Sequence, residues 1–249
     1  MRHILLGLLV LLSTSVAQAN LAVALNDDYR IGDEWGKRPV TADSLVTAAP
    51  AFRRQALATA RVGGATGFYL GQFNGAYVMA TNHHVYEAAF NCLGNEVRFP
   101  LLNIRATCTK FYGTWTDIDL ALFAITPRSA DDARRLNEVA QNFDFGSRLT
   151  VGQQLFTLGF GVANNPQRVL VGNQDSDCRV FAPDYRFMAD PDEFNPGPYR
   201  AWSFANGCDV SHGDSGSAMV DAQSGGKVGK LAATTGMKRV PSCAHCTER

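Results

Sequence analysis

The sequence lacks an excess of charge of either sign. Its 249 residues include 23 Lys and Arg against 23 Asp and Glu, and charged residues make up 18% of the chain. The basic residues form no stripe of the kind that binds a phosphate backbone. Composition therefore gives no support to nucleic-acid binding, and we expect no nucleic-acid partner.

The N-terminal apolar run, Ile4 to Leu12, is much shorter than the roughly 20 residues that a membrane-spanning helix needs. It follows a short basic end with Arg2 and precedes small residues at Ala17 and Ala19. This order is typical of a secretory signal peptide. We expect residues 1–19 to be removed by cleavage near Ala19, which predicts a secreted or periplasmic protein without a stable membrane anchor.

Six cysteines remain after that cleavage, at positions 92, 108, 178, 208, 243 and 246. An even number in an exported chain favours disulfides, although six cysteines allow 15 connectivities. We favour Cys92 with Cys108, because both flank one predicted strand region. Cys243 and Cys246 have metal or redox spacing, but they form only half of a zinc site, so a disulfide is favoured and no metal or cofactor is expected.

Short runs of β-branched, aromatic and aliphatic residues, separated by Gly, Asn and Asp, begin near residue 55 with the run 56–62. They predict an all-β protein, a sandwich or barrel. Residues 20–50 lack sustained periodicity and are interpreted as an N-terminal arm or a pro-segment. One helix is predicted within 126–145, because Ser129 can cap it and apolar residues recur at helical spacing. The predicted β segments are 51–125 and 146–249.

The interval 183–198 is rich in proline and acidic residues and is predicted to be a long surface loop. Asp190, Asp192 and Glu193 within it could bind calcium. A solvated acidic loop is the favoured interpretation, because charge runs in loops usually need no ligand.

A small-residue turn, Gly213 to Gly216, contains Ser215. A serine hydroxyl is a weak nucleophile until a base takes its proton and an acid orients that base. Two histidines, His83 and His84, directly follow a predicted strand, where an imidazole is held rigidly. Metal binding by this pair is disfavoured, because neighbours on an extended chain point in opposite directions. Two acids, Asp117 and Asp119, precede another apolar run and could orient the base.

Three motifs carry a family resemblance. Thr81–Val85 resembles the T-x-x-H-V/C motif of chymotrypsin-like (trypsin-like) serine peptidases, Asp119–Phe123 resembles their D-I/L-A-L-L motif, and Gly213–Gly216 matches their G-D-S-G motif. They occur in the family's order between about residues 50 and 240. The chain looks most like the bacterial secreted branch that includes glutamyl endopeptidases. The resemblance implies two packed antiparallel β-barrels with a short interdomain helix, and a site in the cleft between the barrels.

The resemblance also implies residue roles. Ser215 would attack the carbonyl carbon, His84 would be the base, and Asp119 would orient it, with His83 as a spacer. Asp119 is preferred to Asp117 because only Asp119 is followed directly by Leu-Ala-Leu. The N–H groups of Gly213 and Ser215 would form the oxyanion hole. The implied substrates are proteins or peptides.

Asp209 lies six residues before Ser215, where the trypsin pattern carries the acid that binds Lys or Arg side chains. Lys or Arg specificity is therefore one expectation, with Thr234, Thr235 and Gly236 resembling the strand that lines the substrate pocket. Cys208 does not match the trypsin cysteine position, so Asp209 could instead cap a turn.

The stretch Arg61–Gly64 looks like the cleaved activation site of trypsinogen-type zymogens, whose new amino terminus pairs with the acid beside the nucleophile. Val62 is too near His84 for the intervening strands, so we interpret the stretch as a strand end and a glycine turn. The sequence then identifies no partner for Asp214.

The predicted function is that of an exported serine endopeptidase. The main alternative is a catalytically inactive binding module on the same fold. A serine esterase and a metal-binding envelope protein that uses the paired histidines are further alternatives.

Overall fold

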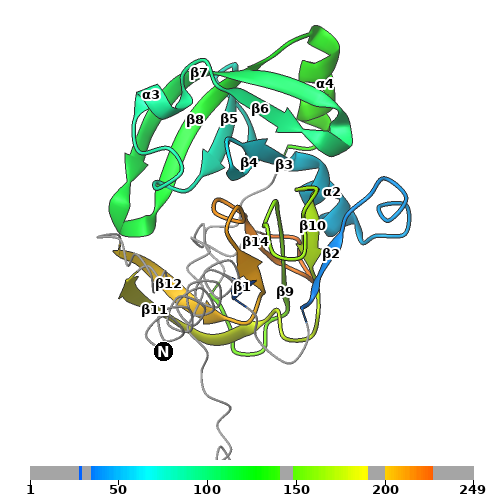
Figure 1. Cartoon of the computed structure of the whole chain (residues 1–249), viewed down its shortest axis with the longest axis vertical. Coiled ribbons are helices and arrows are strands. Elements are labelled where there is room, and N and C mark those ends of the chain that lie inside the picture. Colours follow the sequence, from blue (N-terminus) through cyan, green and yellow to red (C-terminus); the bar gives the residue numbers. More distant parts are fainter. Residues whose placement is uncertain (1–27, 30–34, 141–147, 190–199, 227–249) are drawn as a thin grey trace, which may run out of the picture.

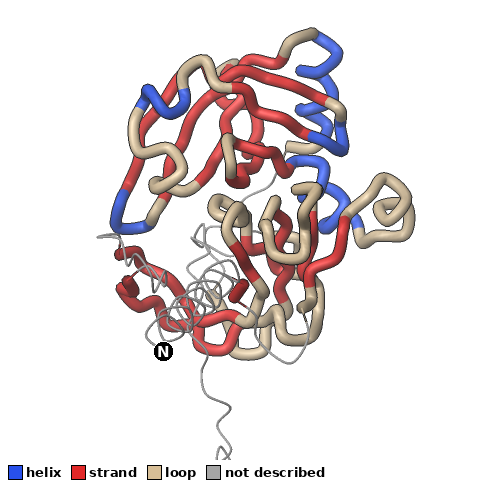
Figure 2. Tube along the Cα trace, in the orientation of Figure 1, coloured by secondary structure: helices blue, strands red, loops and turns tan. Residues whose placement is uncertain are grey.

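The computed structural model describes residues 28–29, 35–140, 148–189 and 200–226. These residues form two β units, with the first above the second in Figure 1. Figure 2 shows that strands dominate both units and that the helices lie at the margins of the first unit and at the junction of the two. The all-β prediction is therefore confirmed.

The first unit is a closed antiparallel barrel in which each neighbouring pair of strands is hydrogen-bonded. In spatial order its strands are β3 (Thr59–Val62), β4 (Ala65–Phe73), β5 (Ala76–Thr81), β8 (Leu120–Pro127), β7 (Ile104–Trp115) and β6 (Glu96–Phe99). Two 3₁₀ turns, η1 (Pro100–Leu102) and η2 (Thr116–Ile118), flank β7. Alternating inward side chains such as Tyr69, Met79 and Phe123 fill the barrel and are fully buried.

The barrel confirms two predictions made from sequence. Cys92, at the end of the short helix α3 (Ala89–Cys92), is bonded to Cys108 on β7. Val62 is the last residue of β3 and pairs with both β4 and β6, and a glycine turn follows it. The stretch Arg61–Gly64 is therefore a strand end and a turn.

Two helices lie beside the barrel. Helix α4 (Ala130–Glu138) confirms the predicted helix, and its N-cap Ser129 accepts a hydrogen bond from the Asp132 N–H at 3.1 Å. Helix α2 (Pro50–Ala58) was not predicted, and the interpretation of residues 56–62 as wholly strand was wrong. Pro50 opens this helix, and Arg, Gln, Ala and Leu extend it because they lose little conformational freedom in a helix.

The second unit contains a four-stranded antiparallel sheet in the order β14 (Met219–Asp221), β9 (Leu155–Gly159), β10 (Val171–Asn173) and β2 (Lys37–Pro39). β1 (Asp28–Tyr29) pairs with β13 (Val210–Ser211). The strands β1 and β2, which come from the N-terminal segment, are thus hydrogen-bonded to strands that follow the barrel in sequence.

A long hairpin, β11 (Val180–Ala189) with β12 (Arg200–Asn206), extends from the second unit. Residues 183–189 therefore belong to a strand, and their prediction as loop was wrong. Aromatic side chains stabilise the pairing across the hairpin, with the rings of Phe187 and Trp202 5.5 Å apart. Asp190, Asp192 and Glu193 lie outside the described residues. Cys178 is bonded to Cys208, whereas Cys243 and Cys246 lie outside the described residues.

A second hydrophobic core joins the two units. It combines Phe68 and Ala80 of the barrel with Phe156 and Leu158 of the sheet, and α2 contributes Phe52. The rings of Phe52 and Phe156 are 5.2 Å apart. The junction of the two units is therefore a packed interface that holds them in one arrangement. Over the described ranges, no helix has both the length and the apolar character needed to cross a membrane.

Candidate active site

His84 and Asp119 form a two-point contact on the barrel. His84 follows the end of β5, and its Nδ1 lies 2.9 Å from Asp119 Oδ2. The other carboxylate oxygen, Oδ1, accepts the backbone N–H of His84 at 3.1 Å. This pairing favours the imidazole tautomer with a proton on Nδ1, in which Nε2 can accept another proton. The His84 side chain is 30% exposed and that of Asp119 only 6%, so the base reaches the surface over a buried acid.

The turn before β8 places Asp119 beneath His84. Asp119 ends η2 in the left-handed region, with φ of 47°, which a short polar side chain tolerates better than most. Asp117, two residues earlier, is exposed. The structure thus brings Asp119 to His84 and leaves Asp117 at the surface.

The Gly213–Gly216 turn lies directly against the barrel. The Thr66 N–H donates to the Ser215 carbonyl oxygen at 2.9 Å, and the Thr66 hydroxyl donates to the Gly213 carbonyl oxygen at 2.7 Å. Gly213 and Gly216 have φ of 95° and 87°. A Cβ on Gly216 would lie 2.0 Å from the Thr66 carbonyl oxygen. Glycine at 216 is therefore what allows the turn to reach β4.

Asn82 connects this turn to the His84 and Asp119 segments. Its side chain is fully buried, and its Nδ2 donates to the Asp119 carbonyl oxygen at 2.8 Å. Its Oδ1 accepts the backbone N–H of Gly216. Asn82 also directly precedes the histidine pair in sequence. One amide side chain thus links the three segments that carry Ser215, His84 and Asp119.

His83 points to a different partner from His84. Its Nδ1 lies 2.7 Å from the Thr114 hydroxyl oxygen on β7, and that hydroxyl donates to the Leu120 carbonyl oxygen at 2.9 Å. His83 is also buried. The two adjacent histidines therefore have separate environments.

Asp214, beside Ser215, is fully buried and has a partner that the sequence analysis did not find. Lys37 Nζ lies 2.5 Å from Asp214 Oδ1, and both side chains are 0% exposed. The sequence analysis placed Lys37 only within residues 20–50, which were interpreted as an N-terminal arm or a pro-segment. No local pattern relates that stretch to a turn near the other end of the chain.

Asp209 is also buried, with 0% exposed, and its Oδ2 accepts the Gly36 N–H at 2.6 Å. Its carboxylate therefore contacts the segment that precedes β2. Thr234, Thr235 and Gly236 lie outside the described residues.

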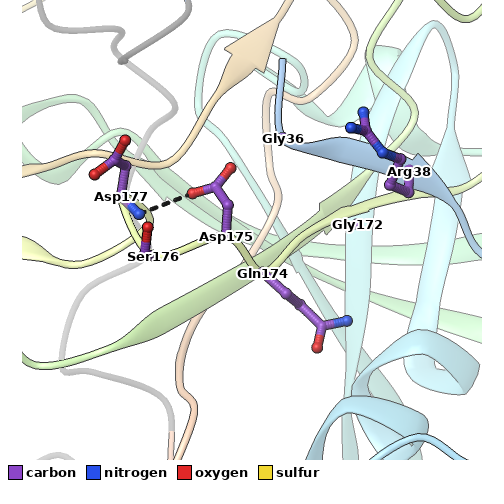
Figure 3. Close-up of a pocket in the computed structure, with 7 residues that line it drawn as sticks. All are labelled: Gly36, Arg38, Gly172, Gln174, Asp175, Ser176 and Asp177. Atoms are coloured by element: carbon purple, nitrogen blue, oxygen red, sulfur yellow. Dashed lines mark hydrogen bonds between the residues drawn. The ribbon is translucent and has the colours of Figure 1, made fainter. Parts of the chain in front are cut away.

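A cavity of about 650 Å³ lies beside β2 and β10, and Figure 3 shows the side chains around it. Its lining consists of Gly36, Arg38, Gly172, Gln174, Asp175, Ser176 and Asp177. The Asp175 carboxylate accepts the backbone N–H groups of Asp177 and Cys178 and the side-chain amide of Asn173. This carboxylate therefore serves as a turn cap, and the cavity is lined by none of His84, Asp119 and Ser215.

No protein-family model matches the sequence, and no curated protein is similar to it. Among solved structures, this one is similar to that of a Glu endopeptidase, with 18% identity, a TM-score of 0.48, and coverage of 80% of this chain and 85% of the other. It is also similar to the active form of a protease from M. tuberculosis, with 16% identity, a TM-score of 0.44 and coverage of 79% of each chain.

At such low identity, the fold assignment rests on the strand pairing of the chain itself. A closed antiparallel barrel is followed by a second antiparallel unit that carries the Gly213–Gly216 turn. This arrangement is consistent with the chymotrypsin-like β-barrel fold; within the described residues the first unit closes into a barrel, and the second is an open four-stranded sheet with two further strand pairs.

Proposed function

We propose that this protein is an exported serine endopeptidase that uses Ser215, His84 and Asp119. The observation that carries the proposal is the two-point contact of Asp119 with His84, linked through buried Asn82 to the turn that bears Ser215. Acyl transfer needs a base held in one tautomer within reach of a serine nucleophile, and these contacts support that arrangement.

In the proposed reaction, His84 Nε2 takes the proton of the Ser215 hydroxyl as its oxygen attacks the scissile carbonyl carbon. The protonated imidazole then gives that proton to the leaving amine as the C–N bond breaks. Water, activated in the same way, hydrolyses the acyl-enzyme and regenerates Ser215. Asp119 remains ionised throughout and stabilises the imidazolium that forms.

Negative charge develops on the carbonyl oxygen during attack and needs preorganised donors. We assign this role to the N–H groups of Gly213 and Ser215. Among the described residues, neither group donates a hydrogen bond to a protein acceptor, which supports the assignment.

Export is part of the proposal. The predicted signal peptide supports it, and the disulfides Cys92–Cys108 and Cys178–Cys208 are consistent with an oxidising compartment. We expect the protein to be secreted or periplasmic after cleavage of the signal peptide near Ala19. Protein or peptide substrates are the expected partners.

From the sequence resemblance we also propose Lys or Arg as the preferred residue before the cleaved bond, with Asp209 as the acid and Thr234, Thr235 and Gly236 as pocket lining. The Asp209 carboxylate is buried and accepts the Gly36 N–H, so a substrate cation would have to approach it beside that contact. Asp209→Asn is then expected to lower kcat/KM for Lys and Arg peptides by at least about tenfold, and to affect peptides with apolar residues less. A library of peptides cleaved by the mature protein measures this. Cleavage mainly after apolar residues would remove Asp209 from the pocket.

Ser215→Ala tests the central claim. We expect kcat for peptide hydrolysis to fall on the order of 10⁶-fold, and labelling by a serine-directed phosphonate to disappear. Ser217→Ala is the matched control, because Ser217 lies in the same segment and its hydroxyl has no hydrogen-bond partner among the described residues. Undiminished labelling of Ser215→Ala would refute the nucleophile. A wild-type protein that reacts with no serine-directed probe would instead support the inactive binding module.

A further inference from the structure

The ion pair between Lys37 and Asp214 joins the N-terminal segment to the turn that carries Ser215. Lys37 is the first residue of β2, and its ion-pair partner Asp214 directly precedes Ser215 in sequence. The 2.5 Å contact has no access to solvent on either side. Within the described part of the chain, Lys37 is the one cationic side chain paired with Asp214.

Asp214 holds the backbone on both sides of the turn. Its Oδ2 accepts the Ser211 N–H at 2.9 Å, and its Oδ1 accepts the Gly161 N–H at 3.1 Å. The carboxylate lies so close to the strand end that a Cβ on Gly159 or Gly161 would approach it to 2.3 or 2.2 Å. The position of this carboxylate therefore determines the position of the chain from Ser211 to Ser215.

A buried carboxylate without a counter-charge is unfavourable, and removal of one partner of a buried pair leaves the other uncompensated. Asp214 would then have to take up a proton or move towards water. Protonation would weaken the hydrogen bonds that the carboxylate accepts from Ser211 and Gly161, and movement would break them. The position of the Ser215 turn thus depends on a charge that comes from β2.

Other contacts hold the same N-terminal segment in place. The Gly36 N–H donates to the buried Asp209 carboxylate, and β1 pairs with Val210 and Ser211. Lys37 itself pairs with Asn173 in the sheet register. Residues 28–29 and 36–37 therefore contact the segment 209–214 at several points, and these contacts hold Lys37 beside Asp214.

We infer that Lys37 is a positioning residue for Ser215, and that its ammonium group provides the positive charge that a cleavage-generated amino terminus would otherwise have to supply. The inference rests on the proposed function. It makes residues 36–39 a permanent part of the active protein rather than a removable pro-segment. It also means that activity does not depend on cleavage at Arg61.

The test compares four variants of the full chain. Lys37→Met removes the charge at similar length, Lys37→Arg keeps it, and Lys37→Met with Asp214→Asn leaves a neutral pair. Lys110→Met is the control, because Lys110 is exposed on the barrel. The measurements are kcat and KM on a cleaved peptide, the rate of phosphonate labelling of Ser215, and the midpoint of urea unfolding.

We expect Lys37→Met to lower kcat and the labelling rate on the order of 100-fold, because a small displacement of the serine has that effect, with KM changed much less. Lys37→Arg is expected to retain more activity than Lys37→Met, and the neutral pair is expected to recover part of the loss. Lys110→Met is expected to match the wild type. If Lys37→Met does not fold, Lys37→Arg and the neutral pair still give the comparison.

Wild-type kcat and labelling in Lys37→Met would overturn the inference. So would a lower unfolding midpoint with unchanged kcat, since that result would give Lys37 a purely structural role. N-terminal sequencing of the labelled protein is an independent check, and a labelled chain that begins at Val62 would also overturn it. A wild-type chain that never reacts overturns the proposed serine chemistry itself, which separates the two failures.

Discussion

Single buried side chains hold the candidate site together across long separations in sequence. Asn82 bonds to Gly216 from 134 residues away and to the Asp119 carbonyl from 37 residues away. A buried polar group that loses its partner costs about 1–3 kcal/mol. The relative positions of the three segments therefore depend on a few side-chain contacts in addition to strand pairing.

The choice between the two candidate acids can be tested directly. Asp119→Asn is expected to lower kcat by about 10⁴-fold, because it changes the group that sets the His84 tautomer while the local geometry stays. Asp117→Asn is the matched control, since Asp117 is exposed, and we expect nearly wild-type rates. Steady-state hydrolysis of one peptide by both variants is sufficient. The opposite ranking would assign the acid to Asp117.

At the scale of elements, the Gly213–Gly216 turn packs closely against β4 and against the chain at the end of β9, and its glycines make this close approach possible. Gly213 faces the Phe160 carbonyl oxygen, which a Cβ would approach to 2.6 Å, and Gly216 faces Thr66. Asn82, directly after β5, then binds the turn, because its side-chain oxygen accepts the Gly216 N–H. The turn is thus defined by the strands around it as much as by its own residues.

Gly216→Ala and Gly75→Ala separate backbone strain from crowding. Both glycines have positive φ, 87° and 81°, but a Cβ on Gly75 meets nothing within 4 Å. Strain in the left-handed region costs each variant about 1–2 kcal/mol. We expect Gly216→Ala to lose about 1–3 kcal/mol more, because the added carbon displaces Thr66, and to lose activity as well. Urea unfolding and peptide hydrolysis measure the two effects. Equal losses in both variants would show that the close approach to β4 is unimportant.

At the scale of the whole molecule, three hydrophobic cores and two disulfides stabilise the described part of the chain. One core fills the barrel, another lies between the barrel, α2 and the second sheet, and a third surrounds the Cys178–Cys208 bond. The candidate site draws on both units, with His84 and Asp119 on the barrel and Ser215 on the second unit. Substitutions that weaken the packing between the two units are therefore expected to lower both the activity of the site and the free energy of unfolding.

Asp221 is expected to contribute to the acid sensitivity of this assembly. Burial raises its pKa, but hydrogen bonds from Ser224, Gln153 and Gln223 outweigh burial, and the pKa lies below its ordinary value of 3.8. A carboxyl group of this kind stabilises the folded state above its unfolded pKa, and the contribution is lost as pH falls through the folded pKa. We expect Asp221→Asn to lower the free energy of unfolding at neutral pH, with the difference from wild type shrinking below about pH 4. Urea unfolding across this range measures it. A difference that stays constant with pH would assign the effect to lost hydrogen bonds alone.

Local patterns predicted much of the fold and failed where tertiary contacts act against them. The Ser129 cap and the apolar spacing predicted α4. The positions of Cys92 and Cys108 on either side of one predicted strand region predicted their bond. Each of these signals lies within one short stretch of sequence. Residues 183–189 looked like loop because of their Pro and Asp, yet pairing with β12 makes them a strand. The chain from Pro50 to Ala58 forms a helix whose buried face packs into the joint between the units.

From residue types at short spacing, the sequence predicted the β class, the turn at Gly213–Gly216 and the candidates Ser215 and His84, with Asp119 preferred to Asp117. The tertiary structure shows that Asp119 contacts His84, that Asn82 joins three segments, and that Lys37 forms an ion pair with Asp214. These contacts connect segments far apart in the chain. Their energy comes from burial of charge and amide groups in a shared interior, which no local pattern encodes.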